Sequence, residues 1–225
     1  MTQARRHAGE IVYGHADGIK GRERFDIDVR ADGRTIHSYC EMVEGHLTRD
    51  ASWTLDTNHR PVEGHVRVVN DGQLVGSSWY HVTETETHCE SLTARFGRMS
   101  QVVAGRRDYL GLHPLIGDGM IALAVGTDSP GVTHMVPSVT CSYDINGETS
   151  LVALPIDIAV TYEGPDEIEV PAGRFTANRY SLQWQPQWPA ANLWVHGEDA
   201  LFLRLQWDFS GLTSELTEYS GGWNL

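Results

Sequence analysis

Residues 24–42, RFDIDVRADGRTIHSYCEM, determine the fold class of this chain. Phe25, Ile27 and Val29 alternate with two aspartates, which is the period of two expected of a strand with one buried face. The Asp32-Gly33 pair then predicts a tight hairpin turn, because glycine adopts the positive φ angles that such turns need. Residues 35–42 alternate in the same way and predict the return strand of a β-hairpin.

The same pattern of strands and turns continues through most of the chain. Turn-forming residues recur about every 8–12 positions, which is typical of all-β sandwiches and barrels. We therefore predict a mainly β protein: one domain over residues 1–225, with a curved antiparallel sheet or open β-barrel of roughly a dozen strands. Besides the first hairpin, the predicted strands are residues 48–55, 62–69, 74–86, 88–96, 99–103, 133–143, 150–162, 167–170, 175–184, 193–196, 200–209 and 213–219.

One segment, residues 106–125 (RRDYLGLHPLIGDGMIALAV), departs from the strand pattern. Its apolar residues recur at three- and four-residue spacing, and Pro114 suits the first turn of a helix. The sequence therefore predicts one short helix near residues 114–125, placed to plug the mouth of an open barrel.

Composition excludes several classes of partner. The formal charge of −13 over 225 residues argues against binding to nucleic acid or to anionic membranes. No apolar stretch approaches the roughly 20 residues of a membrane span, and the N-terminus lacks the apolar core of a secretory signal. Cys40, Cys89 and Cys141 are widely spaced and form no CxxC motif, so we expect buried thiols in a protein of the reducing cytoplasm.

A partial family resemblance lies in the C-terminal quarter. Residues 167–180, EIEVPAGRFTANRY, followed by LWVHGEDALFLRLQW, resemble a pattern of the DUF3108-like group of uncharacterised bacterial β-rich proteins. The resemblance implies a curved antiparallel sheet, or open barrel, with a hydrophobic groove. Pro171 would end one strand and Gly173 would form the turn before Phe175. This motif supports the fold and carries no catalytic residue.

Motifs for metals and cofactors are absent from the sequence. The chain has 11 histidines but neither HxH nor HExxH, so we predict no metal site, although a site built from separate strands by His65, His81 and His88 stays open. There is no GxSxG motif, no P-loop and only one lysine, Lys20. We therefore predict no cofactor.

Two groups of residues are candidates for chemistry. The first, Tyr109, His113 and Asp118, surrounds the start of the predicted helix, where a histidine oriented by a carboxylate would serve as a general base. The alternative is that His113 only caps the turn and that Asp118 is solvated.

The second group would lie on two paired strands. If His65, Arg67, Trp79 and His81 face the concave side, they form a polar and aromatic pocket; if they face solvent, they form an ordinary surface pattern. We predict that His81, His65 and Arg67 assist catalysis and that three aromatic residues contact the ligand: Trp79, Tyr39 and Trp194.

The preferred functional hypothesis is a cofactor-independent lyase, isomerase or hydratase that acts by histidine acid–base catalysis. Its substrate would be a small hydrophobic or aromatic molecule, such as a plant-derived aromatic dimer, with an Arg or Tyr stabilising the oxyanion. The alternatives are a noncatalytic barrel that carries a hydrophobic ligand and an interaction protein whose sheet edges pair in a homodimer.

Overall fold

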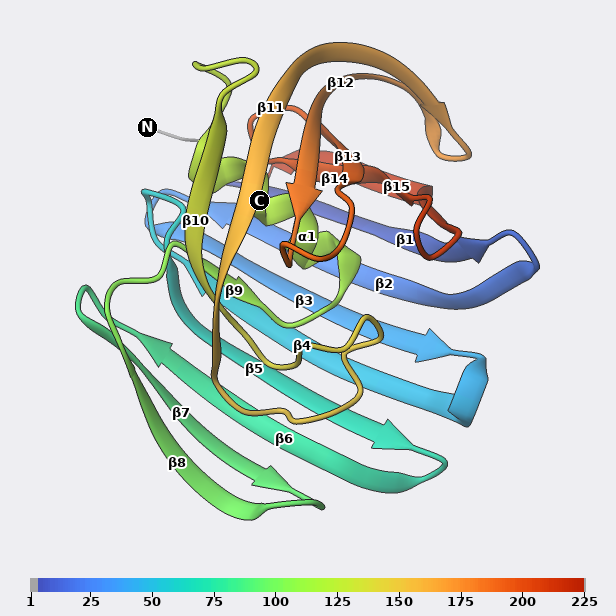
Figure 1. The fold of residues 1–225 in the computed structure, drawn as a ribbon. Helices are drawn as coiled ribbons and strands as arrows, with labels where there is room; N and C mark the ends of the chain where they lie inside the picture. The colour runs from blue at the N-terminus through green and yellow to red at the C-terminus, as the bar shows by residue number, and fades with distance from the viewer. Residues whose placement is uncertain (1–3, 225) are drawn as a thin grey trace.

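The computed structural model describes residues 4–224, whose strands form one mostly antiparallel sheet of 15 strands (Figure 1). The N-terminal half is a continuous meander in which each strand pairs with the next. A 3₁₀ turn, Glu44–His46, precedes the fourth strand. The strands are β1 (Arg5–His15), β2 (Gly18–Arg30), β3 (Gly33–Met42), β4 (Leu47–Leu55), β5 (Pro61–Asn70), β6 (Gln73–Val82), β7 (Glu86–Thr93) and β8 (Gly97–Ala104).

The C-terminal half begins inside the curve of the sheet and then forms a second meander. Its short first strand runs parallel to β10, whereas the later neighbours pair antiparallel. The elements are β9 (Tyr109–Gly111), α1 (Leu115–Val125), β10 (Thr133–Thr140), β11 (Leu154–Val170), β12 (Gly173–Gln183), β13 (Ala191–His196), β14 (Leu201–Trp207) and β15 (Leu212–Asn224).

The first and last strands join the two meanders, because β1 pairs with β2 on one side and with β15 on the other. The sheet curls so that α1 lies inside its concave face (Figure 1). The core fills the space between α1 and the inward side chains of the strands. The prediction of a mainly β, curved antiparallel sheet with one short helix is confirmed.

The hairpin predicted at residues 24–42 is present. Arg30 of β2 pairs with Gly33 of β3, and this pair closes the hairpin. The turn residues are therefore Ala31 and Asp32, one position earlier than predicted. Phe25, Ile27 and Val29 are buried, as their alternation indicated. The return strand also has the predicted faces, with three buried side chains: Ile36, Ser38 and Cys40.

Four strand predictions need correction. β1 was not predicted, because glycines and charged residues obscure its apolar alternation. Residues 74–86 are not one strand, since a turn at residues 83–85 separates β6 from β7. The separate strands predicted at residues 150–162 and 167–170 are one strand, β11, which begins at Leu154, so residues 150–153 lie in the loop before it. The turn-forming pair Asn146-Gly147 lies in a loop between β10 and β11.

The helix is held by close contacts with the sheet. Gly117 faces Trp53 so closely that a Cβ at position 117 would lie 2.7 Å from the Trp53 ring. The Trp53 indole donates a hydrogen bond of 2.9 Å to the carbonyl of Leu110, which fixes the segment that leads into α1. No helix among the described residues has the length and hydrophobicity that a membrane span requires.

One part of the prediction for the cysteines is confirmed, namely that their thiols are buried. All three thiols are free and buried. The cytoplasmic location inferred from them stays a prediction.

Candidate functional site

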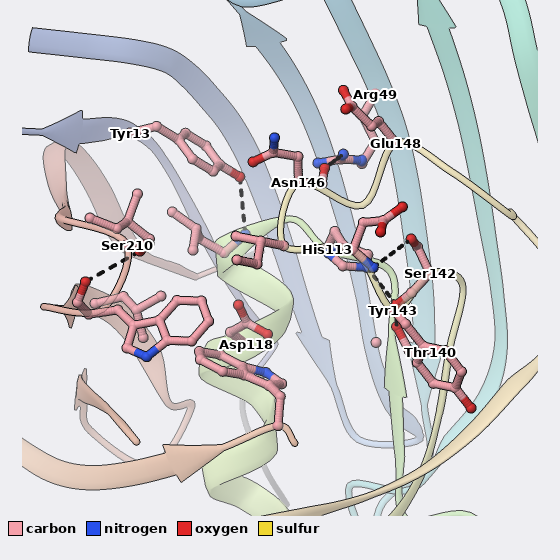
Figure 2. A pocket seen from close by; sticks show the side chains of 18 of the residues that line it. Tyr13, Arg49, His113, Asp118, Thr140, Ser142, Tyr143, Asn146, Glu148 and Ser210 are labelled. Carbon is pink, nitrogen blue, oxygen red and sulfur yellow. Dashed lines mark hydrogen bonds between the residues drawn. The ribbon is translucent and has the colours of Figure 1, made fainter. Parts of the chain in front are cut away.

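A cavity of about 620 Å³ opens between α1, the loop at residues 141–153 and the concave face of the sheet (Figure 2). Small-molecule sites commonly have volumes of roughly 300–1,000 Å³. The cavity receives side chains from both halves of the chain, including Tyr13 on β1, Arg49 on β4 and Thr140 on β10. It is therefore large enough for a ligand and is built by the closure of the sheet.

One wall of the cavity is aromatic. Trp184, Trp188 and Trp207 line it. The ring centroid of Trp207 lies 5.1 Å from that of Trp184 and 5.5 Å from that of Trp188. Rings at these separations pack favourably and present a continuous apolar surface. Ile158 and Leu205 extend this wall, which suits a hydrophobic or aromatic ligand.

A buried carboxylate fixes the helix beside the cavity. Glu23 on β2 accepts hydrogen bonds from the backbone N–H groups of Leu115 (2.7 Å) and Ile116 (3.1 Å). It also accepts bonds from the hydroxyls of Tyr13 (2.7 Å) and Ser38 (2.9 Å). An anion at a helix N-terminus satisfies unpaired N–H groups and interacts favourably with the helix dipole. Glu23 thus positions α1 and every side chain that α1 carries.

Asp118 is the titratable group that α1 places at the cavity. Its side chain projects from the helix into the pocket (Figure 2) and accepts a hydrogen bond of 3.1 Å from the Tyr109 hydroxyl. Burial raises the pKa of Asp118 to about 7; the Tyr109 hydrogen bond opposes this rise and the charge of Glu23 adds to it. The pKa of Tyr109 lies well above 10, mainly because of burial, so its hydroxyl stays a donor at neutral pH. The structure thus brings together two of the three residues that the sequence singled out around the helix start.

His113 also lines the cavity, but its pKa is lower than the near-neutral value expected of a general base. Its Nε2–H donates a hydrogen bond of 3.1 Å to the carbonyl of Ser142. Burial, reinforced by the positive charge of Arg49, lowers the pKa of His113 to about 4. No hydrogen bond joins His113 to Asp118 among the described residues, so the carboxylate does not orient the imidazole. At neutral pH His113 is a neutral imidazole that holds the cavity loop.

Gly147 packs against the His113 ring, so we expect Gly147→Ala to loosen the loop. Gly147 has φ 62°, and a Cβ there would lie 2.2 Å from His113 Cγ. Gly131→Ala is the matched control, because its φ of 75° is similar but a Cβ would meet nothing within 4 Å. We expect the control to lose about 1 kcal/mol of unfolding free energy, and Gly147→Ala at least twice that. Amide exchange at residues 141–153 should rise only in Gly147→Ala; equal effects in both variants would contradict the packing role.

The second predicted group lies outside the cavity. Arg67, Trp79 and His81 are exposed, and His65 is half-buried with a hydrogen bond of 2.9 Å between its Nε2 and the Ser77 hydroxyl. The inward-facing alternative is wrong, and the solvent-facing alternative describes these strands. The reason is that side chains alternate between the two faces of a strand. The apolar residues that alternate with the predicted ones occupy the inner face: Val66, Val68, Tyr80 and Val82.

The two other predicted ligand contacts also lie away from the cavity. Tyr39 is exposed on the outer face of β3. Trp194 is buried, but it lies on the face of β13 opposite Leu193. There its indole donates a bond of 2.9 Å to Asp166, and the guanidinium of Arg204 lies 5.8 Å from the ring centroid. Of the tryptophans that do line the cavity, Trp184 and Trp188 lie in the loop between β12 and β13, and Trp207 ends β14.

The proposed cross-strand histidine site is only partly assembled. His81 and His88 face each other on β6 and β7, with ring centroids 6.4 Å apart. His81 also stacks on Trp79 at 5.9 Å. Within residues 4–224, no group of three or more His, Cys, Asp or Glu side chains is placed to hold a metal ion.

Sequence reasoning missed the tryptophan wall of the cavity and two charged residues of the site. Glu23 lies in a charged stretch, GRER, where nothing in the local pattern separates a buried carboxylate from a surface one. Arg49 alternates with Ala51 and Trp53, and this face of β4 is buried. Its position on an apolar face was the one signal that could have identified it.

Comparisons with known proteins identify the fold. No protein-family model matches the chain, and no curated protein sequence does. A β-barrel-like protein of a domain of unknown function, DUF1849, from Brucella abortus shares the fold over 98% of each chain, with a TM-score of 0.61 and 8% identity. A DUF1089 family protein from Pseudomonas aeruginosa matches 80% of this chain and 87% of its own, with a TM-score of 0.52 and 10% identity.

A third match is a protein with a YmcC-like fold from Bacteroides fragilis, which covers 98% of this chain and 96% of its own at 8% identity, with a TM-score of 0.31. The chain is therefore similar in structure to uncharacterised bacterial β-rich proteins over nearly its whole length. The resemblance noted in the sequence was limited to its C-terminal quarter.

Proposed function

We propose that this chain is a cofactor-independent acid–base enzyme that acts on a small hydrophobic or aromatic molecule in the cavity. The observation that carries the proposal is the Asp118–Tyr109 pair, which faces a cavity with a tryptophan wall. A carboxyl group with a pKa of about 7 exchanges a proton readily near neutral pH. Asp118 would remove a proton from the substrate and return it to the product, while the Tyr109 hydroxyl would stabilise the developing negative charge.

Proton transfer is assigned to Asp118 rather than to His113. A base with a pKa of about 4 is a weak proton acceptor at neutral pH, and the Nε2–H of His113 already donates to Ser142. A lyase, an isomerase and a hydratase would all use the same proton transfer.

We also propose that residues 167–180 are related to the DUF3108-like group. The turn between β11 and β12 at Pro171 supports this relation.

The second candidate is a noncatalytic barrel that carries a hydrophobic ligand. It is favoured by the extent of the aromatic wall and by the role of His113 as a structural donor to the cavity loop. In a carrier, the Asp118–Tyr109 pair would only recognise a polar group of the ligand.

Incubation of the protein in D₂O with a library of small aromatic and alkyl molecules separates the two candidates. Deuterium uptake, cleavage or hydration each changes the substrate mass, so mass spectrometry reports isomerase, lyase and hydratase reactions in one assay. We expect Asp118→Asn to retain the bound compounds but to lose at least 100-fold in turnover. The wild-type rate should rise with pH through about 7, because the ionised carboxylate is the base.

The matched control is Asp157→Asn, which removes an exposed aspartate on the neighbouring strand β11 and should leave turnover unchanged. Compounds that bind the wild type without any change in mass would exclude the enzyme and favour the carrier.

A further inference from the structure

Arg49 is a buried cation with few partners. It lies on β4, is 2% exposed and lines the cavity. Its guanidinium donates a hydrogen bond to the carbonyl of Asn146, whereas its Nε is buried and has no partner among the described residues. The other buried arginine, Arg34, lies 3.5 Å from the carboxylate of Asp199. Arg34 thus has a carboxylate beside it, whereas Arg49 donates to a backbone carbonyl.

No carboxylate of the described residues lies within 4.0 Å of the Arg49 guanidinium. Taking an unpaired charge out of water costs several kcal/mol, so buried arginines are normally paired. Asn70, at the end of the neighbouring strand β5, also lines the cavity, and its Oδ1 is buried with no partner within residues 4–224. Two polar atoms on adjacent strands, Arg49 Nε and Asn70 Oδ1, are thus unsatisfied by the described part of the chain beside the same cavity.

We propose that the cavity binds a small amphipathic carboxylate, whose anionic group pairs with Arg49 and whose apolar body lies against Trp184 and Trp188. This inference rests on the proposed function, because it names the class of ligand that the cavity takes. The Nε–H and the remaining N–H groups of Arg49 match the two oxygens of a carboxylate. In Figure 2, Arg49 lies beside Asn146, away from Asp118 on α1.

The charge of the cavity lining favours a monoanion over a dianion. Besides Arg49, the cationic lining residue is Lys20, whereas four carboxylates line the cavity: Glu44, Asp118, Asp144 and Glu148. These repel a dianion such as a phosphate monoester more strongly than a carboxylate. Lys20 lies 3.0 Å from Asp17 and is thus already neutralised.

Two matched pairs of probes test the proposal by titration calorimetry: naphthalene-2-carboxylate with naphthalene-2-carboxamide, and decanoate with decanamide. Each pair has the same apolar body and differs in charge. We expect the wild type to bind the carboxylates about tenfold more tightly than the amides. Arg49→Met should bring this ratio close to one while the amide affinities stay within about twofold of wild type.

The control is Arg67→Met, which removes an exposed arginine from the outer face of β5 and should keep the tenfold ratio. We expect Arg49→Met to fold, because it removes an unpaired buried charge. If it does not, Arg49→Lys keeps the charge without the planar donors, and its ratio should fall.

The outcomes separate the two proposals. A wild type that binds amides as tightly as carboxylates, or an Arg49 variant that keeps the full ratio, overturns the carboxylate proposal and leaves the cavity as a ligand site. Failure of both members of both pairs to bind overturns the carboxylate proposal together with the proposed function.

Discussion

Glu23→Ala is expected to lower the free energy of unfolding by about 3–5 kcal/mol, because four buried donors lose the carboxylate that accepts their hydrogen bonds. These donors are the hydroxyls of Tyr13 and Ser38 and the first N–H groups of α1, at Leu115 and Ile116. The Glu23 side chain is fully buried, so water cannot replace it without rearrangement of the core.

Urea denaturation measures this loss, and amide exchange shows where it acts. We expect the N–H groups of α1 to exchange faster in Glu23→Ala, because the bonds that tie the helix to β2 are gone. Glu41→Ala, on the exposed face of β3, is the control and should change stability by less than about 0.5 kcal/mol. A Glu23→Ala protein within about 1 kcal/mol of wild type would show that the helix is held by apolar packing alone.

Glu23→Gln is expected to lose less than Glu23→Ala. Burial raises the pKa of Glu23 above its usual value despite the hydrogen bonds from Tyr13, Ile116 and Leu115. A raised native pKa means that the native state favours the protonated carboxyl, so the charge is a cost as pH rises above the ordinary value near 4.5. The neutral amide avoids that cost, but it offers only one acceptor oxygen to the four donors.

Asp199→Asn is expected to lower the free energy of unfolding at pH 7 by about 3–5 kcal/mol, because it leaves the buried Arg34 without a carboxylate partner and removes the shorter ion pair of Arg5. Asp199 accepts hydrogen bonds from Arg5 at 2.5 and 2.7 Å, and it lies 2.9 Å from His7 and 3.5 Å from Arg34. This cluster joins the first strand to the turn before β14, so its loss should also weaken the closure of the sheet at β1 and β15.

The pH dependence identifies the charge as the cause. Burial alone would raise the pKa of Asp199, but the hydrogen bonds from His7 and Arg5 and the charge of Arg34 hold it well below the ordinary 3.8. The group therefore contributes its full stability above about pH 4, and this contribution is lost as pH falls through the native pKa. The difference between wild type and Asp199→Asn in thermal denaturation should thus shrink below pH 4.

The adjacent residue supplies the control for this prediction. Glu198 lies 2.6 Å from Arg5, but its side chain is 79% exposed, so solvent screens the pair. Glu198→Gln should cost less than about 0.5 kcal/mol. An equal loss in both variants would mean that the cluster acts through general surface charge and not through its burial.

The strands that sequence alone could place share one property. β2, β3 and β4 alternate cleanly, because one face meets the core and the other meets water. The helix could be placed because its apolar residues follow a period that no strand produces. The sequence did not predict β1, because its glycines and charged residues weaken the alternation, although its inward residues Ile11 and Tyr13 are buried.

The sequence by itself determined most of the strands and the helix, because hydrophobic periodicity is a local property, and it pointed to Tyr109, His113 and Asp118 as candidates. Only the tertiary structure decided which side chains meet at the cavity. Alternation separates two faces of a strand, but it does not say which face the sheet curls around, so His65 and Arg67 were placed on the wrong side. Glu23 binds Leu115, which lies 92 positions away in the chain, and Arg49 binds Asn146, which lies 97 positions away. Contacts at that range depend on how the whole sheet closes, which no local pattern encodes.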